Sequence, residues 1–293
     1  MTAISFSTEF NNALPIFASP LVETAMIVVP CYNEARRLKN EEFINFLDMA
    51  PRVKIVFVDD GSTDATLETL YQIHQARSEQ VDVISLPKNE GKHEAVRQGL
   101  LHASQTGAGY VGYWDADLAT PLDALHDFLR VIDKFQSVMV VFGSRKTLIG
   151  HRIKRSLARR SVSRICAIMA RQATRLPIGD TQCGAKLLRN NKKLRRAITK
   201  PFTAGWLFDV ELFSRISAQK IDRQKAFYEL PLAEWSEVEG SSVSARAIVS
   251  SGIQMLKIIA TAKLGLATGV ANLNEAPIPK PYSAAPEKSR LRA

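Results

Sequence analysis

Two carboxylates one residue apart, Asp115 and Asp117, form the motif of this sequence best suited to chemistry. They follow residues 110–114, an apolar run that predicts a buried strand. Hard divalent cations such as Mg²⁺ prefer oxygen ligands and keep water and substrate phosphates in their coordination shell. Carboxylates this close also repel each other unless a cation offsets their charge. The pair therefore predicts a site for a divalent cation that meets a phosphate.

Three more polar segments each follow a predicted strand, at residues 30–34, 59–61 and 88–92. Ligands of open α/β sheets bind beyond the carboxyl ends of the strands, so the four segments are expected to converge on one rim. The sequence has no GxGxxG or GxxxxGK[ST] loop, which argues against a dinucleotide fingerprint or a P-loop. Phosphates at this rim must be held in another way.

The elements that position these groups alternate along the first half of the chain. Short apolar runs rich in β-branched residues predict strands at 25–30, 53–58, 81–85, 110–114 and 138–142. Helical patterns lie between them at 34–49, after 63–64, at 90–104 and after Pro121. Strands that alternate with helices of this length form βαβ units with parallel pairing. Residues 25–143 are therefore expected to form a doubly wound α/β half.

After Gly143 the pattern changes to longer basic segments that favour helices, notably at 151–175 and 247–266. We expect residues 144–270 to form an acceptor-side half with basic and amphipathic helices. These helices lie at a membrane surface, cover the sheet or pack in an oligomer. Residues 1–24 are expected to be irregular, and 271–293, with four prolines, to be a disordered tail.

The charge of the chain is concentrated in one block. The 293 residues carry a net charge of +10, yet residues 143–200 alone hold 17 basic side chains and a single acid, Asp180. A block of this kind favours a polyanionic partner such as phosphate, phospholipid head groups or nucleic acid. A basic surface without a specific partner is the alternative.

Composition excludes several classes of protein. The 46% hydrophobic and 23% charged residues are typical of a globular protein. Three cysteines without a CxxC spacing argue against a disulfide framework or a structural zinc site. No stretch of about 18 apolar residues lacks a charge, and the N-terminus has no secretory pattern. A cytoplasmic location is expected.

An ordered series of motifs resembles family 2 glycosyltransferases, which have the nucleotide-sugar-binding GT-A fold. Four motifs carry this likeness: IVVPCYNE at 27–34, VDDGSTD at 58–64, NEGKHEAV at 89–96 and DAD at 115–117. Five more are similar to the dolichyl-phosphate β-glucosyltransferase branch: DLAT at 117–120, GSR at 143–145, DTQCG at 180–184, WLFDVEL at 206–212 and WSEVEGS at 235–241. Leu118 stands where that branch typically has glycine, and the N-terminal membrane helix of its eukaryotic members has no counterpart here.

The resemblance implies an inverting, metal-dependent transferase that moves glucose from UDP-glucose onto a polyprenyl phosphate, dolichyl or undecaprenyl. The donor-binding residues it implies are Pro30, Tyr32, Asn33, Glu34, Asp59, Asp60, Gly61, Lys92, Asp115 and Ala116. Asp117 would bind Mg²⁺ or Mn²⁺, with Asp115 as a secondary ligand. The enzyme would attach peripherally to an anionic membrane at its cytoplasmic face.

On the acceptor side, the resemblance implies catalytic roles for Arg145 and Asp180 beside Asp117. With a polyprenyl phosphate acceptor, the expected acceptor-binding residues are Arg155, Arg159, Gln182, Trp206, Asp209 and Trp235. For the two tryptophans, packing in the core is an equal alternative. Its basic surroundings favour an ionised Asp180, which is then a poor general base near neutral pH. We therefore expect Asp180 either to orient a basic residue against the acceptor phosphate or to form only a salt bridge to neighbouring arginines. With a hydroxyl acceptor, Asp180 would instead remove a proton.

Two alternatives stay open. The same fold serves another nucleotide sugar or a soluble hydroxyl acceptor, or the protein is a non-catalytic binder of polyanions or membranes. The acidic rim favours an enzyme, because Asp59, Asp60, Asp115 and Asp117 have no purpose in such a binder. We expect no nucleic acid partner, and a homo-oligomer is left open.

Overall fold

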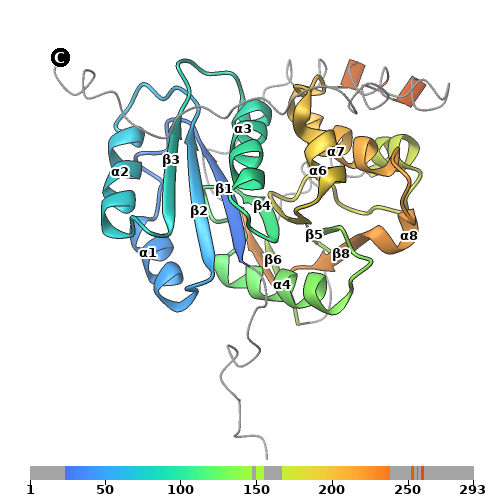
Figure 1. Ribbon diagram of the computed structural model, residues 1–293, viewed down its shortest axis with the longest axis horizontal. Coiled ribbons are helices and arrows are strands. Elements are labelled where there is room, and N and C mark those ends of the chain that lie inside the picture. Colours follow the sequence, from blue (N-terminus) through green and yellow to red (C-terminus); the bar gives the residue numbers. More distant parts are fainter. Residues whose placement is uncertain are drawn as a thin grey trace, which may run out of the picture.

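The structure, a computed structural model, describes residues 24–146, 150–154 and 167–237, and Gly252, Ile253, Leu256, Ile259 and Ala260. In this part of the chain, seven strands form one mixed sheet in the order β3-β2-β1-β4-β7-β5-β8 (Figure 1). They are β1 (Ala25–Cys31), β2 (Val53–Asp59), β3 (Val81–Ser85), β4 (Tyr110–Trp114), β5 (Val140–Ser144), β7 (Ala185–Arg189) and β8 (Phe227–Pro231). A separate ribbon pairs β6 (Arg152–Lys154) with β9 (Glu234–Ser236).

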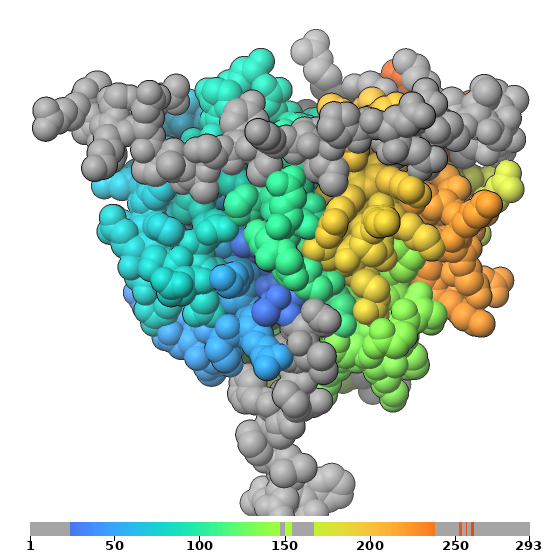
Figure 2. All heavy atoms as spheres, in the orientation of Figure 1, coloured from blue at the N-terminus to red at the C-terminus, as the bar shows by residue number. Residues whose placement is uncertain are grey.

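Helices cover both faces of the large sheet. On one face lie α1 (Asn40–Met49), α2 (Thr66–Ala76), the short η1 (Leu122–Ala124) and α4 (Leu125–Lys134). On the other lie α3 (Lys92–Gln105), α6 (Lys192–Thr199) and α7 (Phe208–Ser217), which follows the short η2 (Gly205–Leu207). The four-residue α8 (Arg223–Ala226) leads into β8. Figure 2 shows α3, in green, beside the yellow residues of α6.

Burial on both faces explains the unbroken apolar sequence of β1. Ile27 and Val29 pack into the core under α1, α2 and α4, whereas Met26 and Val28 pack into the core under α3. Parallel strands covered on both faces read as continuous hydrophobic runs rather than as alternating ones. Gly99 brings α3 close to β1, because a Cβ there would lie 2.3 Å from Val28 Cγ1.

The chain switches direction across the sheet between β1 and β4. From β1 it builds β2 and β3 on one side, and it then returns through α3 to place β4 on the other side of β1. All four strands are parallel, so their carboxyl ends meet at one edge. Such a switch point opens a crevice at that edge. The polar segments after β1 and β4 therefore face each other.

The α/β fold expected from the sequence is confirmed, with shifts at several boundaries. The strand predicted at 138–142 is Val140–Ser144, and the helix predicted from residue 34 begins only at Asn40, after a turn. Antiparallel β7 between β4 and β5, and β8 at the sheet edge, were not anticipated. The sheet thus takes strands from both of the predicted halves.

The predicted helix at 151–175 is wrong at its start, because residues 152–154 pair with β9 as strand β6. Only its end, at 167–174, is helical within the described residues. The predictions for residues 1–23 and 271–293, and most of the predicted helix at 247–266, lie outside the described part. Across the described residues, the helices are too short or too polar to cross a bilayer.

Candidate active site

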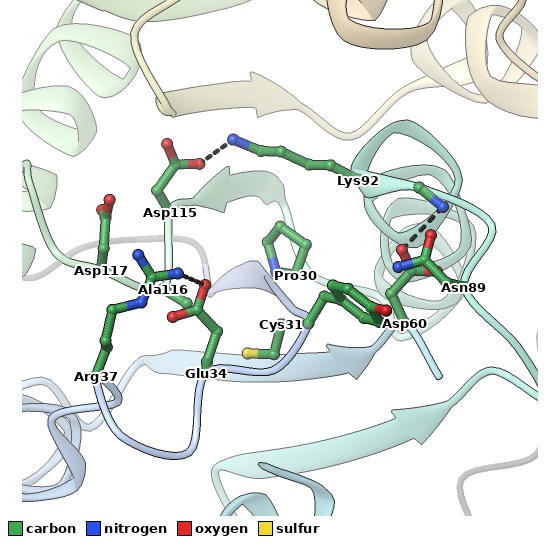
Figure 3. Close-up of a pocket in the computed structure, with 12 residues that line it drawn as sticks. Pro30, Cys31, Glu34, Arg37, Asp60, Asn89, Lys92, Asp115, Ala116 and Asp117 are labelled. Atoms are coloured by element: carbon green, nitrogen blue, oxygen red, sulfur yellow. Dashed lines mark hydrogen bonds and ion pairs between the residues drawn. The ribbon is translucent and has the colours of Figure 1, made fainter. Parts of the chain in front are cut away.

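A cleft of about 340 Å³ opens at the carboxyl ends of β1 and β4 (Figure 3). Its walls come from the segments that follow β1, β2 and β4 and from the start of α3. The lining residues are Pro30, Cys31, Tyr32, Glu34, Arg37, Asp60, Asn89, Gly91, Lys92, Asp115, Ala116 and Asp117. The rim predicted from four separate segments is therefore one continuous cavity.

Asp115 is held on three sides at the end of β4. Its amide donates to Gly184 O (3.1 Å), and Lys92 Nζ lies 2.5 Å from its Oδ1 (Figure 3). The carboxylate packs directly against Gly184, where a Cβ would lie 2.0 Å from Oδ2. Burial by itself raises the pKa of Asp115, but Lys92 and then Lys186 outweigh it and hold the pKa below its ordinary value. Asp115 is therefore an ionised group at neutral pH.

Asp117 directly precedes a residue with a strained backbone. Leu118 has φ of +51°, in the left-handed region that favours glycine. This backbone angle explains why a glycine suits the position. Asp117 Oδ1 accepts from the Ala119 amide (3.0 Å), which fixes the carboxylate beside the cleft. Burial, and then the charge of Asp115, raise the pKa of Asp117. A cation would relieve this crowding of carboxylates.

The turn after β1 presents Glu34 to the cleft. Thr66 Oγ1 accepts from the amides of Glu34 (2.7 Å) and Ala35 (3.0 Å), which ties the turn to the start of α2. Arg37 Nη2 lies 2.6 Å from Glu34 Oε1, and burial raises the pKa of Glu34 although Arg37 lowers it. Arg37 is a cleft residue that the sequence reasoning missed. The sequence feature that could have indicated Arg37 is its position three residues after the acid Glu34, a spacing that favours an ion pair.

Asp60 shapes the wall formed by the loop before α3. Its two oxygens accept from the amides of Glu90 (2.8 Å) and Gly91 (2.9 Å). Gly61, with φ of +66°, lets this loop approach, because a Cβ would lie 2.4 Å from the carbonyl carbon of Lys88. Burial raises the pKa of Asp60. Asp60 thus lines the cleft and also fixes its shape.

Three predicted donor residues hold loops together instead of lining the cleft: Gly61, as described above, and Asn33 and Asp59. Asn33 Oδ1 accepts from the Thr63 amide (2.9 Å). Asp59 accepts from the Ser62 amide (3.2 Å) and from Ser85 Oγ (3.4 Å). Together these contacts join the turn after β1 to the turn after β2, and the end of β2 to the end of β3.

At the end of β5, Arg145 and Asp180 form a buried two-point ion pair. Arg145 Nε and Nη2 donate to the two carboxylate oxygens of Asp180 at 2.7 and 2.8 Å. The guanidinium also lies over the ring of Trp235, 5.2 Å from its centroid. Burial lowers the pKa of Arg145, but Asp180 outweighs it and raises that pKa above its ordinary value. The backbone amide of Gln182 also donates to Asp180 Oδ1 (3.2 Å).

A second ion pair lies inside the protein, behind Asp115. Lys186 on β7 is fully buried; its ammonium lies 3.0 Å from Asp209 Oδ1 and donates to the carbonyl of Cys183. Tyr113 donates its hydroxyl to Asp209 and presents its ring to the ammonium at 4.9 Å. Asp209, predicted to bind the acceptor, thus contacts interior groups. Lys186, counted with the basic block, faces the core.

Comparison with known proteins identifies the family. Residues 26–195, more than half of the chain, match the family described as Glycosyl transferase family 2. The chain belongs to glycosyltransferase family 2. The family predicted from the motifs is confirmed.

Curated relatives of this glycosyltransferase share a name. It is 31% identical to the dolichyl-phosphate beta-glucosyltransferase of Homo sapiens, over 90% of this chain and 82% of the relative. The enzymes of that name from Dictyostelium discoideum (32%; 83% and 75%) and Saccharomyces cerevisiae (30%; 85% and 77%) are similarly related.

Solved structures confirm the GT-A fold. Glucosyl-3-phosphoglycerate synthase from Mycobacterium tuberculosis, in complex with Mn²⁺, UDP and phosphoglyceric acid, superposes with a TM-score of 0.60 at 18% identity, over 84% of this chain and 81% of that one. Its complex with Mn²⁺, UDP and glucosyl-3-phosphoglycerate gives 0.58 over 84% and 82%.

The structure of the glycosyltransferase brings the predicted residues together in two groups. The cleft gathers Pro30, Tyr32, Glu34, Asp60, Lys92, Asp115, Ala116 and Asp117. Arg145, Asp180, Gln182 and Trp235 gather at the end of β5. Trp206 packs on a small separate cluster beside the helix at 167–174, and Arg155 and Arg159 lie outside the described residues.

Proposed function

We propose that this glycosyltransferase moves glucose from UDP-glucose onto a polyprenyl phosphate and inverts the anomeric centre. The observation that carries the proposal is the position of Asp117 and Lys92 on one cleft at the β1/β4 switch point. A carboxylate for a cation and an ammonium for phosphate suit a nucleotide diphosphate. The shared name of relatives that align with 83–90% of the chain supports glucose and a lipid phosphate.

The donor occupies the cleft with its nucleoside between residues 30–34 and Asp60. Glu34 accepts from the ribose, Asp115 lies toward ribose and sugar, and Lys92 lies beside the diphosphate. Lys92 is about half exposed and pairs with Asp115, so it has room to turn toward an arriving phosphate. Asn33, Asp59 and Gly61 support this pocket by fixing its loops.

The residues present fit a divalent cation that arrives with the donor. Among the described residues, no three His, Cys, Asp or Glu side chains gather into a closed metal site. Mg²⁺ usually takes one or two protein carboxylates and completes its shell with phosphate and water. Asp117, with Asp115 as a secondary ligand, supplies that set for Mg²⁺ or Mn²⁺. When bound, the cation stabilises the charge of the leaving diphosphate.

The acceptor phosphate approaches the Arg145–Asp180 pair. Because the second pKa of a phosphate monoester lies near 6, its oxygen is already a nucleophile at neutral pH and needs no base. Asp180 therefore orients Arg145, whose Nε and Nη2 it engages. Gln182, Trp206 and Trp235, with Arg155 and Arg159, complete the proposed acceptor surface. Asp209 supports it from inside through Lys186.

We further propose peripheral attachment to an anionic membrane at its cytoplasmic face. The helix at 167–174 exposes Ile168 (58%) next to Arg171, and Ile253 (55%) and Leu256 (63%) are also exposed. Apolar side chains beside basic ones are typical of segments that lie in the head-group layer. A polyprenyl phosphate presents both an anionic head and an apolar tail to such a surface.

The test is a transfer assay with a panel of labelled nucleotide sugars. Each is incubated with short polyprenyl phosphates or with hydroxyl acceptors, and label is counted in the organic and aqueous phases. We expect label in the organic phase from UDP-glucose and a polyprenyl phosphate. Transfer only to hydroxyl acceptors contradicts the proposed acceptor, and transfer only from another nucleotide sugar contradicts the proposed donor.

A further inference from the structure

Arg37 is a residue of the cleft wall to which the motifs gave no role. Figure 3 shows its guanidinium reaching Glu34, with Nη2 2.6 Å from Glu34 Oε1. Arg37 and Asp117 line the same cleft, and the charge of Arg37 acts against the rise in the pKa of Asp117. The neighbouring Arg36 is exposed and does not line the cleft.

Glu34 is fixed everywhere except at one oxygen. Its amide donates to Thr66 Oγ1 (2.7 Å), and its carbonyl accepts from the amide of Arg37 (2.8 Å). Its Oε1 accepts from Arg37 Nη2. Its Oε2 is buried and, within the described residues, has no hydrogen-bond partner. A buried acceptor left without a donor is costly, so a ligand that supplies a donor here is favoured.

We propose that Arg37 is a positioning residue: it holds Oε1 of Glu34 so that Oε2 accepts a hydrogen bond from a ribose hydroxyl of the donor nucleotide. The inference rests on the proposed function, since it takes the ligand of the cleft to be a nucleotide. Burial makes the Glu34 charge costly, and Asp117 repels it. Without Arg37 the carboxylate therefore loses both its partner and its orientation. Arg37 acts through Glu34 and not through a contact of its own with the nucleotide.

The experiment compares the affinities of UDP, 2′-deoxy-UDP and 3′-deoxy-UDP by calorimetric titration with Mg²⁺ present. The wild type should bind one deoxy analogue about 10-fold more weakly than UDP, because a hydrogen bond to a charged group is lost. Arg37→Met should bind UDP about 10-fold more weakly and bind that analogue and UDP equally. Arg36→Met removes the same charge from the same turn and should behave as the wild type.

Two further variants make the readout independent of a general loss of structure. In a Glu34→Gln background, Arg37→Met should cause no additional loss of UDP affinity. Arg37→Lys keeps the charge without the fork of donors, so it should retain part of the discrimination between UDP and the deoxy analogue. If Arg37→Met does not fold, as judged by circular dichroism, an Arg37→Lys variant with full wild-type discrimination overturns the inference.

The inference is also wrong if Arg37→Met weakens the binding of UDP and of the deoxy analogue by the same factor, since Arg37 then acts on phosphate or on the fold. It is wrong if the wild type binds UDP and both analogues equally. A protein that binds GDP in place of UDP contradicts the proposed donor, and the same comparison with deoxy-GDP then tests Arg37. Binding of no nucleoside diphosphate contradicts both.

Discussion

Arg145 and Asp180 come from segments 35 residues apart and meet in a two-point ion pair, with nitrogen–oxygen distances of 2.7 and 2.8 Å. The amide of Arg145 also donates to the same carboxylate (3.1 Å). Both carboxylate oxygens of Asp180 thus accept from the guanidinium of Arg145. That geometry suits an orienting residue better than a proton acceptor.

Asp180→Asn should therefore impair acceptor binding more than the chemical step. We expect the KM for the polyprenyl phosphate to rise about 10-fold, because a charge-assisted pair is lost. The pH profile of the residual rate should still follow acceptor ionisation near pH 6 and be flat above it. Steady-state kinetics between pH 5 and pH 9 checks both, and Asp127→Asn, which changes a half-exposed acid on α4, serves as the control. Efficient transfer to a neutral hydroxyl, with loss of the acidic limb in Asp180→Asn, would make Asp180 the base.

Asp117→Asn should abolish transfer and yet raise the thermal stability of the metal-free protein. Burial and Asp115 raise the pKa of Asp117, so its ionised form destabilises the folded state. Removing that charge should increase Tm by about 1–3 °C at neutral pH. The difference should vanish as the pH falls below the ordinary pKa of an aspartate, where the wild-type side chain is neutral too. Thermal unfolding with chelator from pH 3 to pH 8 tests this.

Removing the metal provides an independent check on the same site. Wild-type transfer should stop in excess chelator and return with Mg²⁺ or Mn²⁺. Full activity in chelator would exclude the proposed role of Asp117.

Breaking the buried Lys186–Asp209 pair should lower the free energy of unfolding. Lys186→Met leaves the Asp209 carboxylate buried without its cation, which costs about 3–5 kcal/mol. Replacing both partners, as in Lys186→Met/Asp209→Leu, should recover most of this stability. Urea denaturation measures the free energies of unfolding, with Lys225→Met as the exposed control. Equal stability of Lys186→Met and the control would show that the pair contributes little.

Vesicle flotation should show salt-sensitive binding to anionic membranes. Each exposed basic residue near such a surface contributes on the order of 1 kcal/mol at low salt. Ile168→Ser should weaken binding by removing an exposed apolar contact. Phe135→Ser, which changes another exposed apolar residue, at the C-terminal end of α4, is the matched control. Salt-resistant binding, or binding to neutral vesicles alone, would assign the basic block to another partner.

Much of the fold was determined locally. β1 and β4 are continuous apolar runs in which every residue but Pro30 is buried, whereas Lys54 interrupts the apolar run of β2 and Asp82 that of β3. Each of the four strands is followed by a helix that periodicity reveals. Parallel pairing follows from this alternation, and with it the meeting of Asp60, Lys92, Asp115 and Asp117 at one edge. The motifs added the family. For these residues, type and order along the chain were sufficient.

Other features depended on partners distant in sequence. β7 contains Lys186, whose charge argues against a central strand until Asp209 and Tyr113 are seen to surround its ammonium. The basic residues between 143 and 200 were expected to lie at the surface. Composition, however, cannot distinguish a buried, paired Arg145 from a solvated one. In the sequence, nothing distinguishes Arg37 from the adjacent Arg36. The turn that Thr66 holds directs Arg37 to the cleft and leaves Arg36 outside it. Sequence determined which groups reach the rim, whereas long-range packing decided which charges are buried, because burial depends on segments far along the chain.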